Sequence, residues 1–541
     1  MQSSSTPDSL PRHGPCLLKI CFTAILLLLV WNQVRVLTHF AIVYADKDQV
    51  LMWTAAHELL QGRIHEPRFY GQDYNSMIEG YLASPLVASG VPYHVAVPVV
   101  TSVLCLAPFV VLGFCCWRSG QPLAALLALA MPLMLPIEYT MITSMPRGFV
   151  TGNCFITVVA CLILFPMSCR SFFLSGLLLV LGVSLNPTVL IMATPVALVL
   201  VLRHWRSRRF YLWVGAGGLL AAAGHYASVA FYDIYPSHRV YAVLFDEVLS
   251  VEALRRGWRN LDGHLGVLTP VWANQVWILG LVFSAILIGL WRCHARLPFI
   301  SLLLGLVVVG LSFSIERVHV GSDSVYWHLA RFYLSVPLVM VLGFAWFEQA
   351  AGKRLGFGHR NLVSVGLTLL VVTVFVGHGL VYEKVVQKHV GIINPAGVQA
   401  VPVQLIYERC EALGELASQT GHKLVVFGFV HKTVAYACEP ILRERVKTLM
   451  VRDFVAERRT WRLYEERDGP TRDVLFYNFS EEQIKRGQSL GLIPEPAVLI
   501  GNIRTVPGRV PDGVDLFDVL SQMDIPGAQD LEARVGFLGV E

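Results

Sequence analysis

The amino-acid sequence predicts a mostly α-helical membrane protein, a polytopic helical bundle followed by a small α/β domain. Of its 541 residues, 55% are hydrophobic and only 15% are charged, whereas soluble domains usually carry about 25% charged residues. Up to about residue 382 the charges lie in short breaks between apolar runs, and from Glu383 onward they are dense. This shift predicts a membrane domain at 17–383 and a soluble domain at 384–541.

The apolar runs predict the individual membrane helices, because a span needs about 20 apolar residues. Residues 1–16 form a polar tail, and 17–37 is too long for a signal-peptide core and lacks a small-residue cleavage site after it. The fifth and sixth spans meet at Asn186-Pro187, a turn signal that stops a helix. We expect about eleven spans: 17–38, 93–117, 121–139, 149–168, 171–186, 187–203, 210–232, 271–291, 297–315, 329–349 and 362–382.

Basic residues in the short breaks predict the orientation of the helices. With a cytoplasmic N-terminus, every inside break is basic, and the odd number of spans leaves the C-terminal domain outside. We therefore expect a multi-pass protein of the bacterial inner membrane whose C-terminal domain is periplasmic. No basic stripe interleaved with aromatic residues indicates nucleic acid. The inside breaks carry Arg118, Arg170, the run 203–209, Arg292, Arg296, Lys353, Arg354 and Arg360.

The C-terminal domain alternates strand-like runs (423–427, 446–451, 474–477 and 497–500) with helical stretches (402–418 and 481–488). This alternation is typical of an α/β unit with a largely parallel sheet. The domain contains no GxGxxG and no Walker sequence, so we assign it no nucleotide. Cys410 and Cys438 lie here, and an oxidising compartment would permit them to pair. Two buried free thiols are the alternative.

The external loop 38–92 is long for a connection between helices. Asp46 and Asp48 precede its helical stretch 50–61, and aromatic, amide and acidic residues fill 67–82. Because Asp is favoured at helix N-termini, a plain helix cap would explain the two acids taken alone. The rest of the loop instead predicts a polar pocket at the membrane surface, where a lipid headgroup would lie.

This loop resembles the first external loop of the GT-C glycosyltransferases, in particular the group of protein O-mannosyltransferases and lipid A aminoarabinose transferases. That family carries an Asp-Glu pair, and here Gln49 replaces the Glu. A second similarity is the run 331–338, which resembles an Arg-Tyr-Leu-x-Pro-Leu motif of the family. The resemblance covers roughly residues 15–385. In the loop it is carried by Asp48-Gln49, Ala56, His57-Glu58-Leu59, Gly62 and Tyr70-Gly71-Gln72.

The resemblance implies a hexosyl or pentosyl glycosyltransferase. Such enzymes move a sugar from a polyprenyl-phosphate donor to an acceptor hydroxyl of a glycan, lipid or protein at the outer face. The expected general base is Asp48, with Asp46 as its alternative, and such a base contributes about 10²–10⁴-fold. Glu138, at the outer end of the third span, is the expected second acid, although a helix-end charge reaching the interface would look the same.

The leaving lipid phosphate requires a cation, for which Arg331 is the first candidate and Arg147 the second. An interfacial arginine would explain Arg331 equally simply. The external histidines have no metal-ligand spacing and Gln49 weakens a two-carboxylate metal scheme, so we assign no cofactor, with a divalent metal as the alternative. The remaining expected substrate-binding residues are Tyr70, Gln72, Tyr74, Asn75, Glu79 and His328.

Two other classes of protein fit the same composition. A membrane transporter or lipid flippase often has internal repeats and broken helices with charges near mid-membrane. We find no repeat, and the polar residues gather at one membrane face. A non-catalytic anchor for the external domain would leave the loop around Asp48 without a pocket.

Overall fold

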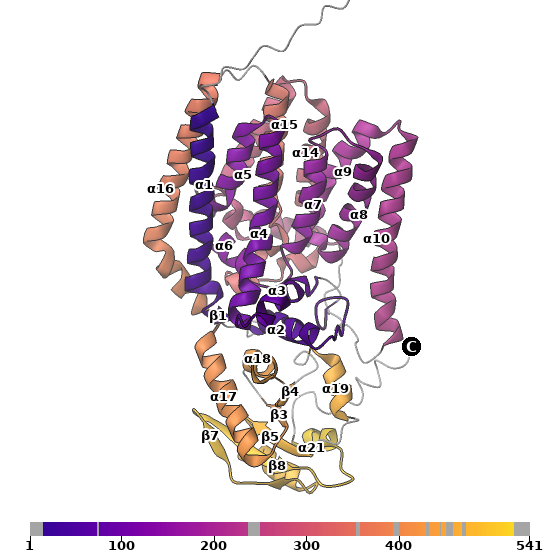
Figure 1. The fold of residues 1–541 in the computed structure, drawn as a ribbon, viewed down its shortest axis with the longest axis vertical. Coiled ribbons are helices and arrows are strands. Elements are labelled where there is room, and N and C mark those ends of the chain that lie inside the picture. The colour runs from indigo at the N-terminus through magenta and orange to yellow at the C-terminus, as the bar shows by residue number, and fades with distance from the viewer. Residues whose placement is uncertain are drawn as a thin grey trace, which may run out of the picture.

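A computed structural model describes residues 15–72, 75–235, 249–352, 357–392, 400–428, 432–443, 445–450, 458–467 and 472–523. Most of the predicted tail, and Lys353, Arg354 and Tyr74, lie outside these ranges. Figure 1 shows long helices running side by side and a sheet domain at one end of them, next to α2 and α3.

The helices of the bundle match the predicted spans. Among the described residues, five helical segments are long and apolar enough to cross a membrane, α5 and α6 form one broken span, and five more helices are apolar but shorter. Each of the roughly eleven predicted spans coincides with one of these, so the prediction of a polytopic helical bundle is confirmed. The helices are α1 (Pro15–Val36), α4 (Tyr93–Arg118), α5 (Pro122–Met134), α6 (Ile137–Ser144), α7 (Thr151–Leu162), α8 (Cys169–Leu185), α9 (Leu190–His204), α10 (Arg208–Ile234), α13 (Val276–Arg292), α14 (Arg296–Ser312), α15 (Val336–Ala351) and α16 (Phe357–Val390).

The predicted third span differs from expectation because it is broken. Helices α5 and α6 meet at an angle of 90°. Pro136 disfavours helical backbone at the residue before it, and Leu135 is extended, with ψ 153°. Glu138 therefore lies in the first turn of a separate short helix. The predicted turn at Asn186 is present, and the Asn186 side chain accepts a hydrogen bond from the Thr188 amide at 3.2 Å.

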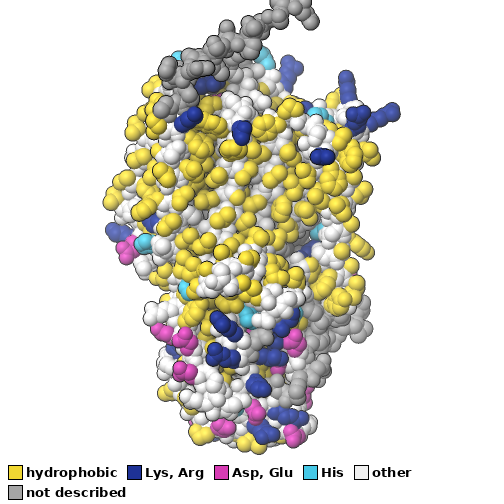
Figure 2. Space-filling view, in the orientation of Figure 1, with side chains coloured by type: hydrophobic (Ala, Val, Ile, Leu, Met, Phe, Trp, Pro, Cys, Tyr) yellow, Lys and Arg dark blue, Asp and Glu magenta, His cyan; other side chains and the backbone are white. Residues whose placement is uncertain are grey.

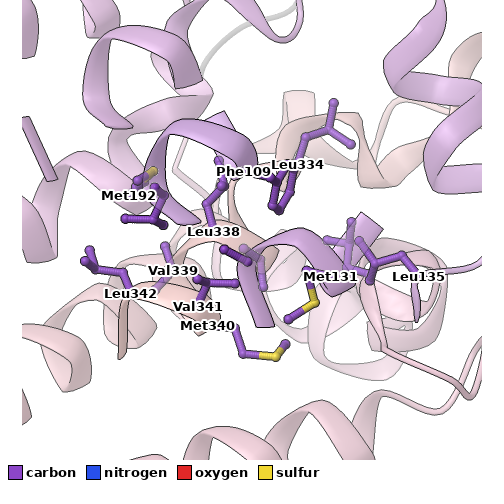
Figure 3. Packing of buried hydrophobic residues seen from close by; sticks show 14 of the residues in the cluster. Phe109, Met131, Leu135, Met192, Leu334, Leu338, Val339, Met340, Val341 and Leu342 are labelled. Atoms are coloured by element: carbon purple, nitrogen blue, oxygen red, sulfur yellow. The ribbon is translucent and has the colours of Figure 1, made fainter. Parts of the chain in front are cut away.

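The core of the bundle lies around α15, in which residues 336–343 are all buried. A helix that is apolar on every side belongs in such a position. Figure 3 shows residues of α15 beside Phe109 of α4 and Met131 of α5. By contrast, only 11% of the apolar stretch of α10, and likewise of α16, is buried. On the face that Figure 2 shows, apolar side chains cover most of the helical part, a surface suited to lipid.

The C-terminal domain is the predicted α/β unit, with strand order β4-β3-β5-β8-β6 and β7 beside β8. The pairs β3–β4 and β3–β5 are parallel, whereas β8 is antiparallel to its neighbours. The prediction of a largely parallel sheet thus holds for the first strands only. The elements are β3 (Leu424–Phe427), α18 (Lys432–Leu442), β4 (Lys447–Met450), α19 (Thr460–Arg467), β5 (Asp473–Tyr477), α20 (Glu481–Gln488), β6 (Ile493–Pro494), β7 (Val498–Ile500), β8 (Ile503–Arg509) and α21 (Leu516–Gln522).

The first external loop and the C-terminal domain share one hydrophobic core. Strand β1 (Tyr44–Ala45) pairs antiparallel with β2 (Val401–Pro402). Helix α2 (Lys47–Leu60) packs on α3 (Ile78–Ala88) and on α18. A disulfide between Cys410 and Cys438 joins α17 (Val403–Thr420) to α18. The common core contains Val50 and Trp53 of α2 together with Ile406, Leu413 and Tyr436.

Candidate active site

The site is built at the N-terminus of α2. Asp46 is the N-cap residue, and its carboxylate accepts a hydrogen bond from the Gln49 amide at 3.0 Å. This contact satisfies one of the amides that a helix start leaves without a partner. Asp48 lies in the first turn, where the helix dipole favours an acid. The helix start therefore explains both carboxylates locally, and their partners decide what each one can do.

Asp46 forms a buried ion pair with Arg147, which lies in the loop between α6 and α7. A second guanidinium nitrogen of Arg147 donates to the Tyr326 carbonyl, and the guanidinium lies 5.7 Å from the centre of the Tyr326 ring. Burial lowers the pKa of Arg147 to about 9. A buried charge is tolerated when it is paired and hydrogen-bonded, so Asp46 and Arg147 neutralise each other.

Two residues predicted to bind substrate, Glu79 and Asn75, form hydrogen bonds with the loop that carries Arg147. The Gly148 amide donates to the Glu79 carboxylate at 3.0 Å, and the Asn75 side-chain amide donates to the Arg147 carbonyl at 3.1 Å. Thr101 donates to the other Glu79 oxygen at 2.9 Å. Burial raises the pKa of Glu79 to about 7. Glu79 and Asn75 thus position Arg147.

Asp48 faces Arg458 of the C-terminal domain, with 3.4 Å between a carboxylate oxygen and a guanidinium nitrogen. The two side chains are 19% and 15% exposed, so this pair lies at a partly open position. Nothing in the sequence distinguishes Arg458, because no motif marks the C-terminal domain and several arginines lie near this one. Only the packing of the domain on α2 identifies it.

Arg331 forms hydrogen bonds within the loop that precedes α15. Its guanidinium donates to the carbonyls of Val320 at 2.6 Å, His328 at 2.9 Å and Trp327 at 3.1 Å. Burial is the largest cause of the lowered pKa of Arg147, and the positive charges of Arg331 and Arg458 lower this pKa further. Arg331 and Arg458, carried by separate segments, therefore each lie near enough to Arg147 to repel its charge.

The other predicted residues lie around this centre. A Glu138 oxygen is 3.5 Å from a ring nitrogen of His389 at the end of α16. His328 is buried, which lowers its pKa to about 4, and its Nδ1 accepts from the Ala330 amide at 3.0 Å. Tyr70 and Gln72 are also buried, and the Tyr70 ring packs edge-on against Trp461 of α19, with 4.6 Å between ring centres.

The described part of the chain contains no group of three or more His, Cys, Asp or Glu side chains placed to hold a metal ion. One carboxylate is buried and paired, a second is partly open, and arginines approach from the bundle and from the sheet domain.

Solved structures share this fold, although no protein-family model and no curated protein sequence matches the chain. ArnT from Cupriavidus metallidurans in the apo state has a TM-score of 0.54 and 13% identity, and covers 91% of this chain and 98% of its own. The same protein bound to undecaprenyl phosphate has a TM-score of 0.52, 11% identity and the same coverage. The Archaeoglobus fulgidus oligosaccharyltransferase reaches a TM-score of only 0.43, at 10% identity over 88% of this chain and 70% of that one.

The chain therefore has the GT-C fold, that of the membrane glycosyltransferases which its first external loop resembles. The similarity to ArnT covers 91% of this chain, so it extends from the helical bundle into the C-terminal sheet domain. The fold agrees with the class of protein expected from the residues around Asp48.

Proposed function

We propose that this protein is a glycosyltransferase that moves a sugar from a polyprenyl-phosphate donor to an acceptor hydroxyl at the outer face of the membrane, with Asp48 as general base. The observation that carries the proposal is the group of two carboxylates and three guanidiniums at the boundary between the apolar helices and the sheet domain.

The charges of this group favour an anionic ligand. Arg147, Arg331 and Arg458 outnumber Asp46 and Asp48, so a phosphate would bring the missing negative charge. Asp46 and Asp48 lie at the start of α2, and Figure 1 shows α2 between the ends of the long helices and the sheet domain, where we expect the lipid headgroups. One ArnT structure holds undecaprenyl phosphate, which supports a polyprenyl phosphate as the ligand here.

The surroundings of the two acids favour Asp48 as the base. Asp46 is fully buried and already caps α2 and pairs with Arg147. A general base must come within hydrogen-bond reach of the hydroxyl that it deprotonates, and Asp48 is the more open of the two. Asp48 would accept the proton as the acceptor oxygen attacks the anomeric carbon. The bond from that carbon to the phosphate oxygen breaks, and the lipid phosphate leaves with the electron pair.

Two features support an outer-face location for this site. The basic break 203–209 lies at the opposite end of the helices from the sheet domain, as expected for a cytoplasmic loop. The Cys410–Cys438 disulfide suits an oxidising compartment such as the periplasm.

A transporter or flippase is the second candidate, since the broken span α5–α6 is a feature that transporters use. The two functions differ in their product. A flippase would move the lipid-linked sugar intact, whereas a transferase would release polyprenyl phosphate.

Asp48→Asn is the decisive variant, tested by lipid mass spectrometry and a transfer assay on the full-length protein. We expect polyprenyl phosphate to co-purify with the wild type, and its glycosylated form to accumulate on Asp48→Asn as transfer falls about 10²–10⁴-fold. Asp46→Asn should instead lower the melting temperature, because it leaves Arg147 buried without its counter-charge. Wild-type transfer activity in Asp48→Asn would exclude Asp48 as the general base. A wild-type protein that binds no polyprenyl phosphate would exclude the proposed class of glycosyltransferase.

A further inference from the structure

We propose that Arg458 of the C-terminal domain binds the phosphate of the lipid-linked donor beside Asp48, so that the C-terminal domain completes the active site. This inference rests on the proposed function and extends it to a residue outside the membrane domain. It begins from the contact between Arg458 and Asp48, which joins two segments far apart in the sequence.

The backbone at Arg458 is fixed from two sides. Its amide donates to the Tyr436 hydroxyl of α18 at 3.1 Å. On the opposite side, Gly71 of the first external loop packs so closely that a side chain there would come within 3.0 Å of the Arg458 carbonyl. Gly71 also has a positive φ of 65°, which favours glycine. The sheet domain and the first external loop therefore both contact the backbone of Arg458, whose guanidinium lies 3.4 Å from the Asp48 carboxylate.

The packing of the first external loop on the sheet domain does not depend on the ion pair between Asp48 and Arg458. Strands β1 and β2 pair across the junction, and α2 shares an apolar core with α18. Trp461 is stacked on His65, with 4.2 Å between ring centres, and packs against Tyr70. The position of Arg458 is better explained by a ligand than by docking.

Arg458 also differs from the other two arginines in its partners. Arg147 pairs with the buried Asp46, and Arg331 donates to three backbone carbonyls of its own loop. Arg458 is the guanidinium that contacts the more exposed acid, on the side of the site formed by the sheet domain. A donor phosphate bound there would bring the anomeric carbon next to the expected base.

The test measures binding of undecaprenyl phosphate to the purified full-length protein by native mass spectrometry, with undecaprenol as the uncharged probe. Hydrogen bonds to charged groups contribute about 1.5–3 kcal/mol, so Arg458→Gln should weaken undecaprenyl phosphate binding roughly 10- to 100-fold. Undecaprenol binding should not change. Arg458→Lys should recover part of the affinity, because it keeps the charge but not the planar fork. In a transfer assay, the donor KM should rise more than kcat falls.

The matched control is Arg472→Gln, which removes an arginine of the same domain that pairs with Asp512 at the surface. It should bind undecaprenyl phosphate like the wild type. Equal binding by the wild type and Arg458→Gln would overturn the role of Arg458 while leaving the proposed function intact. Rapid proteolysis between α16 and α17 in Arg458→Gln alone would make Arg458 a docking residue and also overturn it. A wild type without affinity for the lipid would refute the proposed function itself.

Discussion

At the start of α2, two carboxylates separated by one lysine face different surroundings. Asp46 turns back over the helix end to cap it and pairs with Arg147, while Asp48 lies in the first turn opposite Arg458. Asp46, the N-cap residue, has an extended backbone (φ −121°, ψ 179°), whereas Asp48 already lies in the helix, so the two side chains leave the chain in different directions. The backbone alone can therefore separate a structural carboxylate from a reactive one.

Glu79 should make the stability of the protein depend on pH. Burial raises its pKa from 4.5 to about 7. Between these values the folded protein retains a proton that the unfolded chain has released, so stability falls as pH rises through this window and levels off above about pH 7. Glu79→Gln cannot titrate, so its melting temperature should fall less over the same window. Thermal unfolding of both proteins in one detergent, at several pH values, measures the difference.

Thr101→Val is the control for this measurement. It removes the hydroxyl that donates to Glu79 at 2.9 Å but leaves the carboxyl able to titrate. Its melting temperature should be lower at every pH and should retain the pH dependence. The same slope in Glu79→Gln and the wild type would show that another group causes it.

The sequence named candidate residues for the site but not the partners of these residues. Asp46, Asp48 and Arg147 were all expected, but the sequence ranked Arg331 above Arg147, and only the fold brings Arg147 onto Asp46. Asn75 and Glu79 were expected to bind substrate, and in the structure both hydrogen-bond to the loop that carries Arg147. Pairings between residues so distant in the chain cannot be read from local patterns.

At the scale of elements, α8 and α10 approach each other until their backbones touch. A side chain at Gly176 would meet the Val214 carbonyl at 2.1 Å, and one at Gly217 would meet the Phe173 carbonyl at 2.0 Å. Small residues at such crossings allow close packing of helices in membranes. This contact holds α10, most of whose surface is exposed, to the rest of the bundle.

Gly217→Val should separate α8 from α10. The new side chain has no room against the Phe173 carbonyl, and overpacking of this kind costs about 1–3 kcal/mol. The matched control is Gly215→Val on the same helix, where a side chain would meet nothing within 4 Å. Thermal unfolding in detergent should show a clear loss for Gly217→Val and little change for Gly215→Val. Equal melting temperatures would contradict the close approach.

The apolar runs predicted where each span among the described residues lies, but not where a span bends. A window of apolar residues cannot detect that Pro136 turns the chain by 90°, because both halves are equally apolar. In the C-terminal domain, β8 was missed since it contains Pro507 and Gly508, residues that are unfavourable in strands. The missed strand is the one that makes half of the sheet antiparallel.

At the scale of the whole molecule, the helical bundle and the sheet domain are joined through the first external loop. The loop contributes α2 to the core of the sheet domain, and its contacts with the bundle include the pairs of Asp46 with Arg147 and Glu79 with Gly148. The candidate site lies at this junction. Substitutions that destabilise the sheet domain should therefore also disturb the candidate site, because α2 belongs to both.

The Cys410–Cys438 disulfide is the most direct test of this arrangement in the cell. It closes a loop of 28 residues, and a cross-link of that size contributes roughly 3–4 kcal/mol in the chain-entropy description. Replacing both residues by alanine should lower the melting temperature of the sheet domain and reduce transfer. In denatured protein, both thiols should react with a maleimide only after reduction.

Cys115 and Cys161, in the helical bundle, serve as the internal control, because both are free thiols and should react without reductant. Reaction of Cys410 and Cys438 without reductant, in protein isolated from intact cells under thiol-blocking conditions, would contradict the bridge. It would also remove a main support for a periplasmic sheet domain.

The pairing of Tyr44 with Pro402 and of Ala45 with Val401 has a consequence for biosynthesis. The ribosome synthesises the described helices of the bundle before it reaches Val401. The first external loop therefore has no partner strand during most of translation. Until then α2 exposes the apolar side that later meets α18. A messenger cut short after α16 would encode a protein whose bundle can insert but whose first loop never acquires its final neighbours.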